Sequence, residues 1–126
     1  MFLEELLPEE RVAFIELAAL IAGVDGNLSV YEHSILEKYK KEMDLKNYQI
    51  KGWAMEEILN TFKTKRAKTI VLTELFQLIF SDGILHEQEN VCIRQIKKHF
   101  GFDEKEFQSF KDWVDRIKEL SNELGK

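Results

Sequence analysis

Two helical stretches of the chain carry apolar side chains on nearly every face, and each leads into the dipeptide Asp-Gly. The first runs from Pro8 to about Val24 and the second from Ile70 to Phe80. A helix with apolar side chains on nearly every face must be covered by other elements on most of its surface. A chain of 126 residues does this most simply by packing the two helices against each other, with amphipathic helices around them.

The surroundings of the two Asp-Gly dipeptides repeat with an offset of 57 residues, which superimposes Asp25 on Asp82 and Glu32 on Glu89. Each copy reads as a buried helix, an acidic turn, an amphipathic helix and a further helix. The sequence therefore predicts one all-α domain over residues 1–126, a compact bundle of about six to seven helices. We expect two repeats, at about 8–60 and about 64–124, related by an approximate two-fold axis.

The other helices follow from capping and periodicity. Ser29 with Glu32 three residues later is a capping-box pattern, which predicts a helix that runs to about Met43. A third helix is expected from Asn47 to about Leu59. His86 takes the place of Ser29 in the second copy and is expected to be a capping or surface residue. The helix after it should bury Val91, Cys92, Ile96 and Phe100, and a last helix is expected from about Glu104 to Leu124.

Charge and cysteine content narrow the function classes. The net charge is −5, and an acidic surface repels nucleic-acid backbones, so we expect no nucleic-acid partner. The lone cysteine, Cys92, allows no internal disulfide and fits a reducing compartment. No apolar run approaches the ~20 residues of a membrane span, and the acidic first residues do not resemble a signal peptide. We expect a soluble, cytoplasmic protein with at most indirect membrane contact.

The carboxylates of the two turns form the candidate site. Asp25 and Asp82 follow the ends of buried helices, where the helix dipole disfavours a carboxylate by a few tenths to about 1 kcal/mol. In a structural interpretation, both accept hydrogen bonds from turn N–H groups, while Glu32 and Glu89 cap the next helices. In the other interpretation, the four converge on a divalent cation, since oxygen ligands suit Ca²⁺, Mg²⁺ or Mn²⁺.

The sequence lacks the residues that other kinds of binding or catalytic site require. An EF-hand loop would need ligands where the chain has Ile21 and Gly23, or Leu78 and Phe80. There is no cysteine pair or HExxH motif for zinc. There is also no nucleophile with a paired base, no glycine-rich phosphate loop and no cofactor fingerprint. We therefore expect a protein that is not an enzyme.

The stretches "ALIAGVDGNLSVYE" at 19–32 and "LFQLIFSDGILHEQE" at 75–89 resemble the TerB-like family, known from tellurite-resistance operons and from the N-terminal domain of DjlA co-chaperones. The segment "IKKHFGFDEKEF" at 96–107 is similar to the helix-break-helix close of that family. The resemblance covers roughly residues 12–113. It implies a duplicated all-helical fold, usually cytoplasmic, a stress or tellurite response, and larger complexes. It also implies metal binding at the acidic positions, here Asp25, Glu32, Asp82 and Glu89.

Two further segments are candidates for binding. The basic run "KTKRAK" at 63–68 is expected to be a solvated segment between helices, with binding of phosphate or an acidic partner as the alternative. The last helix carries an apolar seam that should pack on the core of the domain, with a homodimer contact as the alternative: Phe110, Trp113, Ile117, Leu120 and Leu124. The leading hypothesis is a TerB-like module that binds a divalent cation, a protein partner or both. The alternative is a purely structural interaction or dimerisation domain.

Overall fold

The computed structural model describes residues 2–23, 30–79, 87–103, 105 and 110–124. In this part of the chain every regular element is a helix, which confirms the predicted all-α bundle. A short 3₁₀ helix, η1, precedes the α-helices. The bounds are η1 Leu3–Glu5, α1 Pro8–Ala22, α2 Val30–Glu42, α3 Met55–Asn60, α4 Lys65–Ile79, α5 Glu87–Phe100 and α6 Phe110–Leu124. None of the described helices combines the length and apolar character needed to cross a bilayer.

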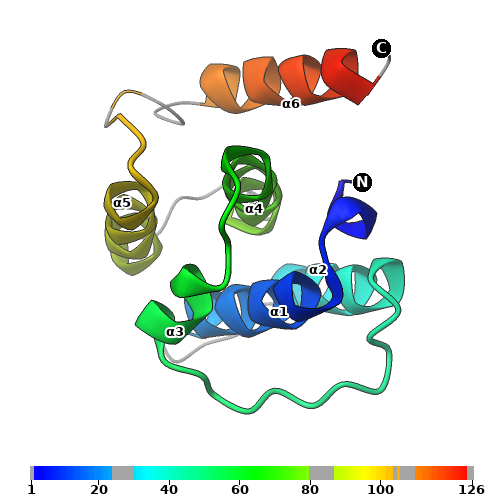
Figure 1. The fold of residues 1–126 in the computed structure, drawn as a ribbon. Helices are drawn as coiled ribbons and strands as arrows, with labels where there is room; N and C mark the ends of the chain where they lie inside the picture. The colour runs from blue at the N-terminus through cyan, green and yellow to red at the C-terminus, as the bar shows by residue number, and fades with distance from the viewer. Residues whose placement is uncertain (1, 24–29, 80–86, 104, 106–109, 125–126) are drawn as a thin grey trace.

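The helix α4 lies at the centre of the bundle. Figure 1 shows it between the α1–α2 pair and α6, and it contacts all three of these helices. The helix α1 also contacts α3 and α5, and η1 contacts α2 and α4. The two apolar stretches of the sequence therefore pack against each other, as their composition predicts.

The core is built mainly from these two helices. In α1, Phe14, Ile15 and Leu17 are fully buried, and in α4 so are Leu72 and Leu75. The amphipathic α2 adds its own buried stripe, in which the Tyr39 ring meets Phe14 edge-to-face with centroids 5.1 Å apart. Such aromatic pairs stabilise a core by about 0.5–1.5 kcal/mol beyond the burial of their area. The periodicity of this part of the sequence predicts a buried stripe of Ile35, Leu36, Tyr39 and Met43. Leu36, Tyr39 and Met43 are buried, and Ile35 is half-buried.

The helices α2 and α5 end in the same way. After each helix one residue takes the left-handed conformation, Asp44 with φ 61° and Gly101 with φ 82°. The next N–H then donates to the carbonyl five residues back, at 2.7 Å from Leu45 to Lys40 and at 2.9 Å from Phe102 to Lys97. This is a Schellman motif, in which glycine is favoured because it has no Cβ.

The helix ends repeat along the chain. Both bounds of α4, Lys65 and Ile79, follow the bounds of α1 by 57 residues, and Gly101 follows Asp44 by the same interval. The offset found around the Asp-Gly dipeptides thus extends to the described helices. The two-fold relation between the repeats and the division near residue 60 stay predictions.

The prediction of the third helix was wrong for its first half. Residues 47–54 are not helical, and α3 contains only Met55–Asn60. The N–H groups of Lys51, Gly52 and Trp53 donate instead to the carboxylate of Glu16. Gly52 has φ +78°, a conformation that does not continue a right-handed helix.

Other boundaries also differ from expectation. The helix α4 begins at Lys65 rather than Ile70, so most of the basic segment is its first turn. Thr64 starts this helix, since its hydroxyl oxygen accepts the N–H of Ala67 at 3.1 Å, the usual N-cap bond. In α5, Cys92 is buried as expected, but Val91 is 41% exposed because it lies beside the buried stripe.

Candidate functional site

Of the four predicted ligands, only Glu32 has a side chain that the structure describes. Asp25 and Asp82 lie outside the described residues, and Glu89 lies in the first turn of α5 with a side chain that is also outside them. Glu32 lies in the first turn of α2 and has only 6% of its surface exposed. Each acidic turn thus joins a central helix to the following amphipathic one: α1 to α2, and α4 to α5.

The described residues alone do not form a metal centre. In the ranges with placed side chains, no three His, Cys, Asp or Glu residues gather as a cation would require. Three of the four predicted carboxylates are outside this search. Their convergence on one ion stays a prediction, and so does the capping interpretation.

A different carboxylate, that of Glu16 in α1, accepts several hydrogen bonds from one segment of the chain. Its Oε2 atom accepts the Tyr48 hydroxyl at 2.6 Å and the Lys51 N–H at 2.7 Å. Its Oε1 atom accepts the N–H groups of Gly52 at 2.9 Å and Trp53 at 3.1 Å. With 1% of its surface exposed, Glu16 fixes the non-helical segment before α3 to the middle of α1.

The hydrogen bonds of Glu16 decide its protonation state. Burial by itself would raise the pKa of this carboxyl, but the Tyr48 hydroxyl and the three backbone donors outweigh burial and hold the pKa below its ordinary value. The same contact, together with burial, raises the pKa of Tyr48. Glu16 is therefore a charged structural acceptor, and its donors occupy the positions that a metal ion would take.

A second buried acid, Glu74, lies in the middle of α4. It is 1% exposed, and its pKa is raised by burial and by the nearby charge of Glu42. The Tyr39 hydroxyl donates to the Glu74 carbonyl oxygen, and Glu42 accepts the Leu3 N–H at 3.1 Å. These contacts connect α2 with η1 and with α4, so the role of these residues is structural.

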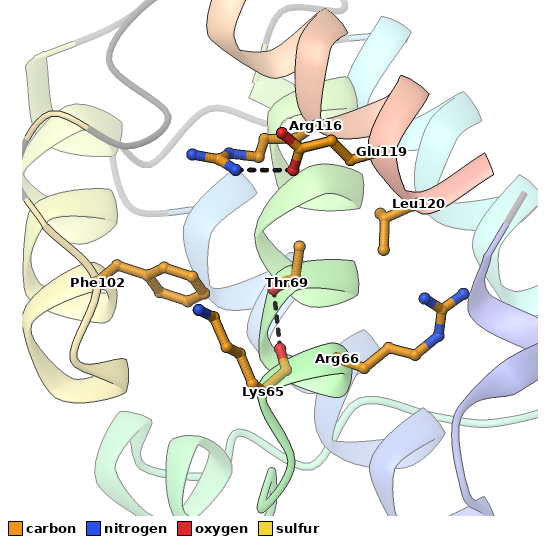
Figure 2. Close-up of a pocket in the computed structure, with 7 residues that line it drawn as sticks. All are labelled: Lys65, Arg66, Thr69, Phe102, Arg116, Glu119 and Leu120. Carbon is orange, nitrogen blue, oxygen red and sulfur yellow. Dashed lines mark hydrogen bonds and ion pairs between the residues drawn. The ribbon is translucent and has the colours of Figure 1, made fainter. Parts of the chain in front are cut away.

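The basic segment lines a pocket of about 340 Å³ between the start of α4 and the middle of α6. Figure 2 shows Lys65, Arg66 and Thr69 on α4, with Arg116 and Glu119 on α6 above them. The Phe102 ring, just after α5, and the Leu120 side chain add apolar walls. This volume lies near the lower end of the roughly 300–1,000 Å³ of small-molecule sites.

The three cations of this pocket differ in their partners. The Arg66 guanidinium holds Glu5 with two bonds, at 2.9 Å and 3.1 Å. The Arg116 guanidinium contacts Glu119 at 2.8 Å on its own helix. Within the described chain, no carboxylate lies at ion-pair distance from the Lys65 ammonium. Lys65 thus supplies positive charge that nothing described there neutralises.

Comparison with known families supports the resemblance seen in the sequence. Residues 52–112 match the family model of tellurite resistance protein TerB. Over these residues the chain is similar to TerB. The match spans just under half of the chain and takes in α3, α4, α5 and the start of α6, so two of the TerB-like acidic positions, Asp82 and Glu89, lie inside it. No curated protein and no solved structure matches the chain.

This similarity links residues 52–112 to a family that is named for tellurite resistance. The match does not reach Asp25 or Glu32. Sequence reasoning missed the role of Glu16, although an acid inside an apolar helical run is a usable signal, since it must find donors when buried. It also placed Lys65 and Arg66 in a linker, whereas Thr64 was an available N-cap signal.

Proposed function

We propose that the protein is a non-enzymatic, TerB-like binding module whose acidic turns hold a divalent cation, Ca²⁺, Mg²⁺ or Mn²⁺. The observation that carries the proposal is the TerB match over residues 52–112, together with the second acidic turn at the same offset. Asp25, Glu32, Asp82 and Glu89 would supply only oxygen ligands, which suits hard cations. In such a module the cation would fix the helix ends and prepare a surface for a protein partner.

The helix contacts support a shared site. The helix α1 contacts α2, α4 and α5, so the elements on both sides of the two acidic turns belong to one packed group. Glu32 is largely buried at the start of α2. A buried carboxylate needs hydrogen-bond donors or a cation to remain charged. This requirement agrees with metal binding and equally with helix capping, so a titration has to separate them.

The test is calorimetric titration of the protein with CaCl₂, MgCl₂ and MnCl₂, paired with thermal melts. A cation that binds only the folded state stabilises it by RT ln(1 + [L]/Kd), about 2.7 kcal/mol at a concentration of about 100 Kd. We expect saturable heat with at least one of the three cations and a melting temperature that rises with its concentration. The Asp25→Asn/Asp82→Asn double variant should lose both effects.

A matched control removes two charges elsewhere. Asp44 and Asp115 are exposed and lie outside both acidic turns. The Asp44→Asn/Asp115→Asn variant should bind the cation like the unchanged protein. If no cation gives heat or a melting shift, or if both double variants respond alike, the cation proposal is wrong. A loss of stability without a loss of binding heat would instead assign the turns to helix capping.

The second candidate is a structural interaction domain that dimerises through α6. The described part of the α6 seam favours packing within the chain. Leu120 is buried in the core, Trp113 and Ile117 pack against it, and the Trp113 indole N–H donates to the Thr73 carbonyl at 2.6 Å. Sedimentation equilibrium would test the dimer directly, and a concentration-independent monomer mass would exclude it.

A further inference from the structure

The described lining of the pocket between α4 and α6 contains none of the four predicted cation ligands. Its α4 residues lie in the first two turns of that helix, whereas the second acidic turn follows the end of the same helix at Ile79. Among the described residues, three cationic side chains line it against one carboxylate: Lys65, Arg66 and Arg116 against Glu119. The chain as a whole has the opposite sign of charge, −5. A local excess of positive charge in an acidic protein requires a physical reason.

Helix stability does not provide that reason. Lys65 and Arg66 are the first two residues of α4, where the positive end of the helix dipole disfavours cations by roughly 0.3–1 kcal/mol each. Glu5 compensates Arg66 through its two bonds. Lys65 has no such carboxylate among the described residues. Its ammonium and the dipole of α4 thus add their positive potentials at the same place.

Two of the side chains that line the pocket point toward each other. In Figure 2, Lys65 and Phe102 extend toward each other from α4 and from the end of α5, and Thr69 lies one turn further along α4. The Thr69 hydroxyl donates to the Lys65 carbonyl at 2.8 Å, so its oxygen can still accept a bond. Phe102 and Leu120 contribute apolar side chains to the pocket wall.

We propose that this pocket binds a small organic anion with one phosphate or carboxylate group on an apolar or aromatic body. The anionic group would meet Lys65 and Arg116, and the body would lie against Phe102 and Leu120. The volume of about 340 Å³ suits a molecule of this size. A long polyanion is disfavoured, because beyond the pocket it would meet a surface whose net charge is negative.

The test is a titration of ¹⁵N-labelled protein with phenyl phosphate, inorganic phosphate and benzoate, followed by amide shifts and calorimetry. We expect phenyl phosphate to bind about tenfold more tightly than inorganic phosphate, because only the former buries a ring. The shifted amides should belong to residues 65–69, 102 and 116–120. Comparison of phenyl phosphate with benzoate identifies the preferred anionic group.

Three variants make the test specific. Lys65→Gln should weaken phenyl phosphate binding about tenfold, the usual effect of one charge-assisted hydrogen bond. Lys63→Gln removes an exposed lysine of the same basic run that does not line the pocket, and it should change binding less than about twofold. Phe102→Leu should weaken phenyl phosphate more than inorganic phosphate. Circular dichroism of each variant checks that the helices remain.

Three results would contradict the proposal. It is wrong if none of the three anions binds saturably at tens of millimolar. It is also wrong if Lys63→Gln weakens binding as much as Lys65→Gln, since the effect would then be diffuse attraction. Amide shifts confined to residues outside the pocket would likewise overturn it. None of these results bears on cation binding at the acidic turns.

Discussion

The carboxylate of Glu16 accepts the hydroxyl of Tyr48 at 2.6 Å across 32 positions of sequence. The same carboxylate also accepts three consecutive backbone N–H groups, those of Lys51, Gly52 and Trp53. One buried side chain therefore replaces the backbone acceptors that this segment would find in a helix. Much of the local architecture before α3 depends on its negative charge, and the first two predictions concern this charge.

Replacement of Glu16 with glutamine should destabilise the fold. The amide keeps one oxygen acceptor but turns an NH₂ group toward backbone donors, so at least one buried N–H loses its partner. Hydrogen bonds to a charged group contribute about 1.5–3 kcal/mol each, and a loss of about 2–3 kcal/mol is expected. Urea unfolding measures the loss. Glu9→Gln, at an exposed position of the same helix, is the control and should change the free energy of unfolding by less than about 0.5 kcal/mol.

The contribution of Glu16 should depend on pH in a defined direction. Its folded-state pKa lies below the ordinary value of 4.5, so the unfolded state takes up a proton first as the pH falls. The stabilisation is therefore complete above about pH 4.5 and disappears as the pH falls through the folded-state value. The difference in unfolding free energy between the native protein and Glu16→Gln should shrink between neutral pH and pH ~3. A constant difference would show that charge is not the cause.

The paired helix ends predict opposite effects of two small substitutions. Asp44 has φ 61° and Gly101 has φ 82°, and a Cβ in this region costs about 1 kcal/mol or more. Asp44→Gly should therefore stabilise the protein by up to about 1 kcal/mol, and Gly101→Ala should destabilise it by about 1 kcal/mol. Apart from its chain neighbours, no atom of the described residues lies within 4 Å of a Cβ built at Gly101, so the substitution tests backbone strain. Thermal melts that shift in the same direction would contradict the assignment.

The attachment of α6 should depend on one indole hydrogen bond. Trp113→Phe removes the N–H that donates to the Thr73 carbonyl at 2.6 Å, while much of the ring surface remains. A loss of about 1 kcal/mol in unfolding free energy is expected. Trp53→Phe is the control, because Trp53 reaches Glu16 through its backbone N–H, which the substitution keeps. Equal losses in the two variants would mean that ring volume, not the hydrogen bond, is responsible.

The fold class and the central helices could be predicted from the sequence because they depend on local periodicity. Apolar side chains lie on most faces of α1 and α4, and such helices are buried on most of their surface. The segment at 47–54 could not be predicted in this way. Its apolar residues, Tyr48, Ile50 and Trp53, also fit a helical pattern, but its N–H groups are taken by Glu16 at separations of 35–37 residues. Tertiary partners of this kind override local propensity.

The two candidate sites also differ in whether the sequence could predict them. The acidic residues Asp25, Glu32, Asp82 and Glu89 were found because they repeat in sequence, and they remain predicted ligands. The pocket of Lys65 and Arg116 joins residues about fifty positions apart. Only the packing of α6 on α4 brings them together, and that register cannot be inferred from spacing within either helix.

The contacts of Glu16 also have a consequence for hydrogen exchange. Residues 51–53 belong to no helix, yet each of their N–H groups donates a hydrogen bond to the buried carboxylate of Glu16. Deuterium can replace these protons only when the segment detaches from α1. Three slowly exchanging amides should therefore stand out within an otherwise fast-exchanging connection, and their rates would report how often the centre of the molecule opens.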